Sequence, residues 1–105
     1  MSQSLSNSQL HLIQNKLSLE AFECLLLRFA ADGDSLLFLN DSVFVLLLAE
    51  FQSKKFYQLT SKVTIYAIDE QLQARNITAF TDKVKTIDFA DFIEKSQNCS
   101  KIVSW

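Results

Sequence analysis

Two cysteines and one histidine are the side chains of this 105-residue chain best suited to nucleophilic or acid–base chemistry. Cys24 lies in a helix-like segment, and Arg28 follows one helical turn later, so a nearby cation could make the thiol reactive. The thiol sits in mid-helix, however, away from the helix N-terminus that activates thiols most. Cys99 falls in a polar loop. Cys24 is therefore the candidate catalytic residue, and an unreactive surface thiol is the plainer alternative.

His11 falls within a short strand-like run. A single histidine provides neither a metal cluster nor an evident catalytic triad, because both need several ligating or proton-transferring side chains together. We therefore expect a strand residue whose ring nitrogens are satisfied by hydrogen bonds.

Acidic side chains follow several strand-like segments, as Asp41, Asp69 and Asp88 do. In an open parallel sheet such positions meet at the carboxyl ends of the strands, and carboxylates gathered there could hold a divalent cation. Each aspartate also stands where its side chain could cap the first turn of a following helix. We expect caps rather than a metal site.

The composition disfavours cofactor and nucleic-acid sites. Gly33 is the only glycine, so neither a GxGxxG nor a Walker loop can be built, and nucleotide or flavin cofactors are not expected. The net charge is −2, with two basic and six acidic side chains in residues 1–52 and eight basic and six acidic ones in 53–105. Because nucleic-acid binders concentrate their cations on one face, we expect no direct binding to nucleic acid.

Strand-like and helix-like segments alternate along the chain. Ser18 can cap the first helix, whose apolar stripe comprises Leu19, Phe22, Leu26, Phe29 and Ala30. Gly33 follows where a left-handed backbone is commonly required. The alternation predicts an α/β domain whose parallel strands are joined by right-handed crossovers, with helices on both faces of the sheet. We expect strands at 10–13, 35–39, 62–68, 84–88 and 101–105, and helices at 18–31, 69–76 and 89–98.

Residues 34–51, DSLLFLNDSVFVLLLAEF, form the most apolar stretch of the chain. A transmembrane helix needs roughly 20 apolar residues in a row. Asn40, Asp41 and Ser42 interrupt the stretch, and three polar groups at mid-bilayer would be costly, so no membrane span is predicted. Asp41 or Ser42 is well placed to cap a second element that begins near Val43.

The run VFVLLLA has no polar stripe, so an element formed there is apolar on every side. Because large exposed apolar patches usually mark interfaces, we expect a second protein to cover it. The alternative is a strand, or a helix clamped beneath residues 51–59, buried in its own domain. The predicted interface residues are Val43, Phe44, Leu46, Leu47 and Leu48.

The N-terminal residues MSQSLSNSQ have neither a basic nor an apolar region, so no secretory signal is expected. Two cysteines cannot form a disulfide framework and fit a reducing cytoplasm. We expect a flexible tail over residues 1–9 and a single domain over residues 10–105.

Four stretches resemble the TusB/DsrH family in this order and at similar spacing: GDSLLFLNDSVF, IYAIDEQLQARNI, IDFADFIEKSQN and the final SW. The early LHLI, with His11, is similar to the short first strand of that family. The resemblance covers nearly everything from Leu10 to Trp105. It implies a three-layer α/β/α fold of the DsrE/F/H type, with a mostly parallel sheet.

The resemblance also implies a role as one subunit of a cytoplasmic sulfur-relay complex. Members of the family assemble with TusC-like and TusD-like subunits into a heterohexamer. The complex passes persulfide sulfur through a TusE-like carrier toward 2-thiouridine at the wobble position of tRNA. The persulfide cysteine belongs to the TusD-like subunit, so this chain would be a partner rather than an enzyme on its own.

Two alternatives to that role stay open. DsrH-type relatives of sulfur-oxidising bacteria serve a sulfur-oxidation relay, and some carry a cysteine on the first helix. Cys24 lies near that position without matching it, so the resemblance transfers no role to it, although Cys24 could itself carry persulfide sulfur. A receiver-like metal-binding domain that uses Asp41, Asp69 and Asp88 is the other alternative. The unusually apolar VFVLLLAEF departs from the family pattern and is consistent with a buried subunit contact.

Overall fold

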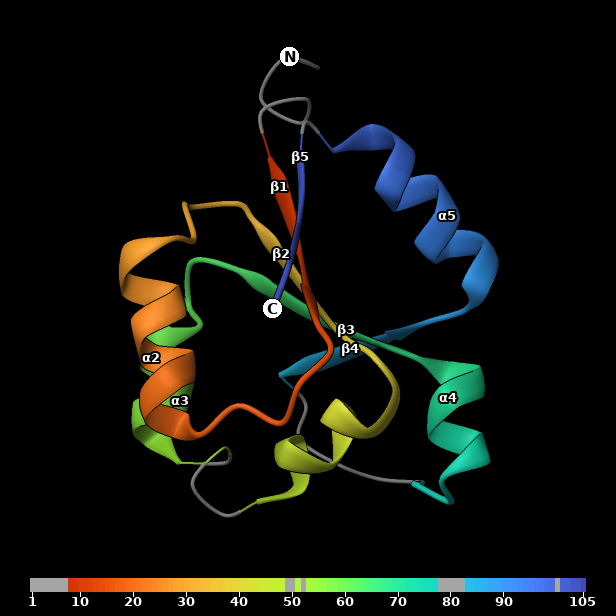
Figure 1. The fold of residues 1–105 in the computed structure, drawn as a ribbon, viewed down its shortest axis with the longest axis horizontal. Coiled ribbons are helices and arrows are strands. Elements are labelled where there is room, and N and C mark those ends of the chain that lie inside the picture. Colours follow the sequence, from red (N-terminus) through yellow and green to blue (C-terminus); the bar gives the residue numbers. More distant parts are fainter. Residues whose placement is uncertain (1–7, 49–50, 52, 78–82, 100) are drawn as a thin grey trace.

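The computed structural model describes residues 8–48, 51, 53–77, 83–99 and 101–105. At its centre lies a five-stranded, all-parallel sheet with the strand order β4-β3-β2-β1-β5 (Figure 1). The strands are β1 (Gln9–Ile13), β2 (Ser35–Phe38), β3 (Thr64–Ile68), β4 (Val84–Ile87) and β5 (Lys101–Ser104). The helices are α2 (Leu19–Arg28), the 3-10 helix η1 (Asn40–Leu47), α3 (Lys54–Leu59), α4 (Asp69–Ala74) and α5 (Phe89–Asn98).

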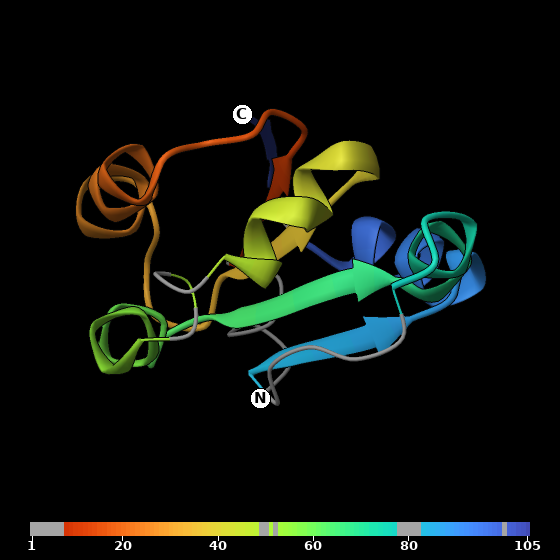
Figure 2. The same ribbon diagram turned by 90° about the horizontal axis from the view of Figure 1, so that it is seen from below.

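The two faces of the sheet are covered unequally. Successive side chains of a strand point to opposite faces, and the strand register aligns His11, Leu36, Ile65 and Val84 on one of them. That face, called here the α2 face, is covered by α2, η1, α3 and α4 (Figures 1 and 2). In the described part of the chain, α5 is the only helix that covers the opposite face, called the α5 face. The predicted three-layer α/β/α architecture is confirmed, with more helices on the α2 face than on the α5 face.

Aromatic rings fill the core of the α2 face. The ring of Phe22, from α2, lies 5.6–5.7 Å from those of Phe38, Phe51 and Phe56. These side chains are fully buried, and aromatic pairs at this spacing add to the stabilisation from burial alone. The core therefore joins α2 to β2, to α3 and to the segment that precedes α3.

The core of the α5 face is smaller. Leu10, Leu37 and Ile68 are buried there, and Phe92 of α5 packs against them while partly exposed. No described residue of α5 is fully buried. Helix α5 therefore rests on the sheet through a narrow contact.

Two of the predicted helix caps are confirmed. The Oγ of Ser18 accepts a hydrogen bond from the backbone N–H of Ala21 at 3.1 Å, and Asp88 accepts one from the N–H of Asp91 at 2.8 Å. Gly33 adopts a φ of 88°, the left-handed conformation expected of it.

The predicted caps at residues 41, 42 and 69 are wrong. Helix η1 begins at Asn40, and no side chain caps its first turn. The Oγ of Ser42 instead donates to the carbonyl oxygens of Ile13 at 2.6 Å and Leu39 at 2.7 Å. Helix α4 begins at Asp69 itself, immediately after β3, without a side-chain cap. Both helices start so close to the preceding strand that the aspartates fall inside the first turn.

Of the predicted N-terminal tail, residues 1–7 lie outside the described residues, and Gln9 is the first residue of β1. Within the described parts of the chain, the helices are too short or too polar to cross a bilayer.

Candidate functional site

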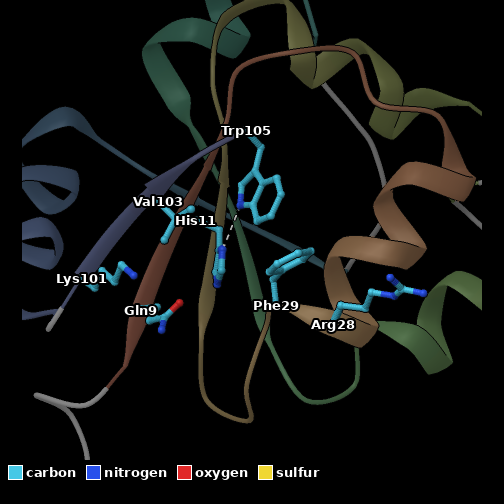
Figure 3. Close-up of a pocket in the computed structure, with 7 residues that line it drawn as sticks. All are labelled: Gln9, His11, Arg28, Phe29, Lys101, Val103 and Trp105. Carbon is cyan, nitrogen blue, oxygen red and sulfur yellow. Dashed lines mark hydrogen bonds between the residues drawn. The ribbon is translucent and has the colours of Figure 1, made fainter.

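A buried hydrogen-bonded chain of three side chains crosses the α2 face at β1. The Nε2 of His11 lies 3.0 Å from an Oδ of Asp34, which immediately precedes β2. On the other side of the ring, the Nε1–H of Trp105, just after β5, donates to the His11 Nδ1 at 3.0 Å (Figure 3). His11 and Asp34 are 0% and 1% exposed, so the hydrogen bond between them is shielded from water, whereas Trp105 is partly exposed.

The donors and acceptors fix the protonation state of His11. An indole N–H can only donate, so the His11 Nδ1 must carry no proton, and Nε2 is then the protonated nitrogen that donates to Asp34. The ring is therefore neutral and both nitrogens are occupied. This agrees with the expectation of a hydrogen-bonded strand residue, and it leaves His11 without a free nitrogen for a metal or a substrate.

Asp34 is the ionised group at one end of this hydrogen-bonded network. Burial by itself raises the pKa of its carboxyl group. Hydrogen bonds from the backbone N–H groups of Ala31 at 2.9 Å and Gln9 at 3.0 Å, together with His11, outweigh burial and hold the pKa below its ordinary value. Asp34 thus joins the end of α2, β1 and β2 through one charged group.

Beside this network, the α2 face has an open hollow of 330 Å³. At one side of it, Phe29 and Trp105 pack against each other, with ring centroids 5.1 Å apart (Figure 3). Arg28 and Lys101 supply cations to the lining, and neither makes an ion pair with another described residue. The lining residues are Gln9, His11, Arg28, Phe29, Lys101, Val103 and Trp105.

The place of Phe29 corrects the predicted apolar stripe. Helix α2 ends at Arg28, so Phe29 leaves the helical face that carries Phe22 and Leu26, and 55% of its surface is exposed. Its ring packs on Trp105 instead of entering the core. Periodicity placed it inside because the helix was expected to continue to about residue 31.

Neither cysteine lies in the hollow or in the histidine network. Cys24 is exposed in the middle of α2. Cys99 is partly buried after α5, and its Sγ donates to the carbonyl oxygen of Ser96 at 3.3 Å. Of the two cysteines, both of which the structure describes, Cys24 is therefore the exposed one.

The three aspartates of the possible cation site lie apart and have separate partners. Asp41 accepts a hydrogen bond from Arg75 at 2.9 Å, Asp69 accepts one from Gln73, and Asp88 caps α5. Within the described residues, no three histidine, cysteine or acidic side chains converge to hold a metal ion. The receiver-like alternative is therefore not supported.

The predicted interface residues divide into two groups. Val43 and Leu46 are 1% and 0% exposed and belong to the core of the α2 face, so their own domain encloses them. Phe44, Leu47 and Leu48 are 38–46% exposed, and we call these three side chains the η1 patch. The expected element that is apolar on every side is thus half buried, and the η1 patch is the part that a partner could contact.

A second exposed apolar group lies on α5. Phe89 and Ile93 are 44% and 53% exposed and stand one helical turn apart, so they share a face of the helix. We call this pair the α5 patch. The sequence analysis predicted this helix but did not single out the pair.

The chain resembles known proteins over most of its length. The family model described as "DsrH like protein" matches residues 18–102. Protein TusB of Serratia proteamaculans is 32% identical over 81 residues, which cover 76% of this chain and 83% of that protein. Protein TusB of Salmonella dublin and of an Escherichia coli O81 strain are each 29% identical over 83 residues, with the same coverage.

One solved structure with a similar fold is the crystal structure of the ychN protein from E. coli. It covers 94% of this chain and 99% of its own, with a TM-score of 0.70 and 10% sequence identity. At that identity the likeness concerns the fold alone.

Proposed function

This chain belongs to the DsrH-like protein family, and from that premise we propose that it is a non-catalytic subunit of a Tus-type sulfur-relay complex. The observation that carries the proposal is the family match over residues 18–102, together with relatives named TusB across three quarters of the chain. In the proposed role, the chain supports 2-thiolation of the wobble uridine of tRNA without carrying the sulfur itself.

The geometry of the reactive side chains favours a non-catalytic role. The neutral ring of His11 uses both nitrogens in buried hydrogen bonds, so it offers no base to a nearby thiol. Cys24 lies in mid-helix, where the backbone N–H groups that would stabilise a thiolate are already paired within α2. A persulfide carrier in the complex would then be another subunit.

The proposed partners are TusC-like and TusD-like subunits in a heterohexamer, with a TusE-like carrier that receives the sulfur, in the cytoplasm. The η1 patch is the proposed contact with one of these subunits. Phe44, Leu47 and Leu48 are adjacent and partly exposed on an element whose other side chains anchor it in the core. An exposed apolar patch on an element packed into the core in this way is suited to bind a partner.

Co-expression of this chain with tagged TusC-like and TusD-like proteins tests the assembly. We expect the three chains to elute together in size-exclusion chromatography at the mass of a complex. The double variant Leu47→Ser/Leu48→Ser should weaken this co-elution. Leu27→Ser provides a matched control, because Leu27 is a leucine 67% exposed on α2, away from the η1 patch.

The outcomes separate the subunit role from the choice of interface. A wild-type chain that stays monomeric beside both partners would contradict the subunit role. Assembly that persists in the double variant and is lost in Phe89→Ser/Ile93→Ser would move the interface to the α5 patch while the subunit role stands.

A second candidate function is favoured by the exposure of Cys24. In this alternative the chain is a DsrH-type subunit of a sulfur-oxidation relay, and Cys24 accepts persulfide sulfur from a donor cysteine persulfide, whose thiol is released. The assembled complex is loaded with persulfide and examined by intact-mass spectrometry. A gain of one sulfur on this chain that disappears in Cys24→Ser and persists in Cys99→Ser would support the alternative. An unmodified chain beside a modified partner would exclude it.

A further inference from the structure

Strand β5 forms an edge of the sheet with an open outer side. Trp105 donates its backbone N–H to the carbonyl oxygen of Leu12 in β1 at 2.8 Å. In a parallel ladder alternate residues bond to the same neighbour, so Lys101 and Val103 also face β1, whereas the backbone groups of Ile102 and Ser104 point outward. Among the described residues, β5 pairs with β1 alone, and Figure 1 looks directly onto its free side.

This edge has few of the features that usually prevent strand addition. Edge strands are commonly protected by lysines, prolines or bulges. The other edge strand, β4, carries the exposed Lys85 and is preceded by Lys83. Strand β5 has a single lysine at its start, continues with Ile102 and Val103, and leads into Trp105. Its backbone is therefore available to a further strand.

The hollow lies against the same edge. The side chains of Lys101 and Val103 line it, and Trp105, the next residue in this alternation, closes its far end (Figure 3). A strand added outside β5 would place every second side chain on this face, about 7 Å apart. One such side chain would lie near Lys101, the next near Val103, and the one after that near the rings of Phe29 and Trp105.

The charged side chains that line the hollow favour a negatively charged ligand. Lys101 and, on the other side of Phe29, Arg28 are exposed cations without an ion-pair partner among the described residues (Figure 3). No acidic side chain is among the described residues that line the hollow. We propose that the β5 edge binds an extended acidic segment of a partner protein as an additional strand. Its carboxylate lies beside Lys101, and an apolar side chain four residues away on the same face packs on Phe29 and Trp105 (Figure 3).

In this mode of recognition, the backbone and the side chains have separate roles. The outward N–H and C=O groups of Ile102 and Ser104 would bond to the backbone of the segment and give affinity, while the hollow would select its side chains. The proposal goes beyond the sulfur relay and does not depend on it, because it requires only the edge, the cations and the aromatic wall.

Trp105 is the only tryptophan of the chain and lies in the hollow, so its fluorescence reports occupancy directly. The 105-residue chain is titrated with seven-residue threonine–valine peptides that carry glutamate and phenylalanine four positions apart. Both orders of the two residues are used, because the added strand can run in either direction. We expect a saturable change in Trp105 emission with one order, and weaker binding when glutamate is replaced by glutamine.

Two variants and one control separate the contributions of charge and backbone. Lys101→Gln should weaken binding of the glutamate peptide by about threefold and leave the glutamine peptide unchanged, because an exposed ion pair is worth little. Lys85→Gln on β4 removes the same charge from the other edge and should have no effect. Ser104→Pro removes an outward N–H without touching a bond to β1, and should weaken binding by about tenfold.

If Ser104→Pro does not fold, a wild-type protein titrated with a peptide N-methylated at its central amides provides the same test. Loss of binding with that peptide supports strand addition. Binding that ignores N-methylation, or that phenylpropionate reproduces at similar concentration, would show a small-anion pocket and overturn the proposal. The absence of a saturable signal with every peptide would also overturn it.

Discussion

At the scale of single residues, the main feature is the hydrogen-bonded network of Asp34, His11 and Trp105. We predicted that His11 is a strand residue whose ring nitrogens are hydrogen-bonded, and the structure agrees. Its partners were not predictable by spacing, because they stand 23 and 94 residues away in the sequence. Only the strand order, with β1 between β2 and β5, brings the three together. The sequence around His11 therefore predicts that it is a hydrogen-bonded strand residue. Its hydrogen-bond partners follow only from the order of the strands in the sheet.

Asp34→Asn is the residue-scale test of this network. At neutral pH the substitution should lower the free energy of unfolding by about 2–3 kcal/mol, because an amide presents N–H donors where the carboxylate accepts hydrogen bonds. Urea unfolding followed by circular dichroism measures the loss. Asp32→Asn, two residues earlier and exposed, is the control and should change little.

The same variant gives the pH dependence. Hydrogen bonding holds the pKa of Asp34 in the folded state below its value in the unfolded chain. A group of this kind stabilises the fold fully above its unfolded-state pKa, and the contribution is lost as the pH falls through the folded-state pKa. The difference in unfolding free energy between wild type and Asp34→Asn should therefore shrink below about pH 4. A difference that stays constant down to about pH 3 would contradict the assignment of Asp34 as the charged group.

At the scale of elements, η1 explains why residues 43–48 looked uniformly apolar. A 3-10 helix has about three residues per turn, so side chains three positions apart lie above one another. Val43 and Leu46 accordingly both point inward, and Phe44 and Leu47 both remain partly exposed. Patterns of period 3.6 or 2 do not detect this division. The sequence revealed an unusual apolar element but could not say which half the domain itself covers.

Leu46→Ala and Leu47→Ala form a matched pair of variants within η1. Leu46→Ala leaves a cavity in the core and should cost about 2–4 kcal/mol of unfolding free energy. Leu47→Ala should change stability by less than about 0.5 kcal/mol, because its side chain is 40% exposed. Chemical denaturation of both variants decides the point. Equal losses would mean that the two leucines are buried alike and that the η1 patch is not free.

The turn between α2 and β2 depends on Gly33. Its φ of 88° lets its N–H donate to the carbonyl oxygen of Lys62 at 2.8 Å, which ties the turn to the start of β3. No atom lies close to the position that a Cβ would occupy, so Gly33→Ala carries backbone strain without a clash. We expect a loss of about 1 kcal/mol in thermal or urea unfolding, and a smaller loss for Gly33→Asn, because asparagine tolerates the left-handed region better. An alanine variant as stable as wild type would exclude strain at this turn.

At the scale of the whole molecule, the two faces of the sheet are covered unequally. The order of strands and helices was predictable because segments of different periodicity alternate clearly. The thin covering of the α5 face was not, since it depends on α5 alone returning across the sheet from β4 to β5. The result is a domain with apolar side chains exposed on both sides, in the η1 patch and in the α5 patch.

A chain with two such patches should self-associate when its partners are absent. We expect sedimentation velocity of the purified chain to show a weight-average mass that rises with concentration, because contact between exposed apolar surfaces is favourable and non-directional. Leu47→Ser/Leu48→Ser and Phe89→Ser/Ile93→Ser should each reduce the rise. Addition of the proposed TusC-like and TusD-like partners distinguishes the two patches. Self-association through the patch that forms the subunit interface should disappear when the partner covers it. Self-association through the other patch should persist. A wild-type chain that stays monomeric at all concentrations would show that neither patch is adhesive by itself, and the case for a subunit would then rest on family membership alone.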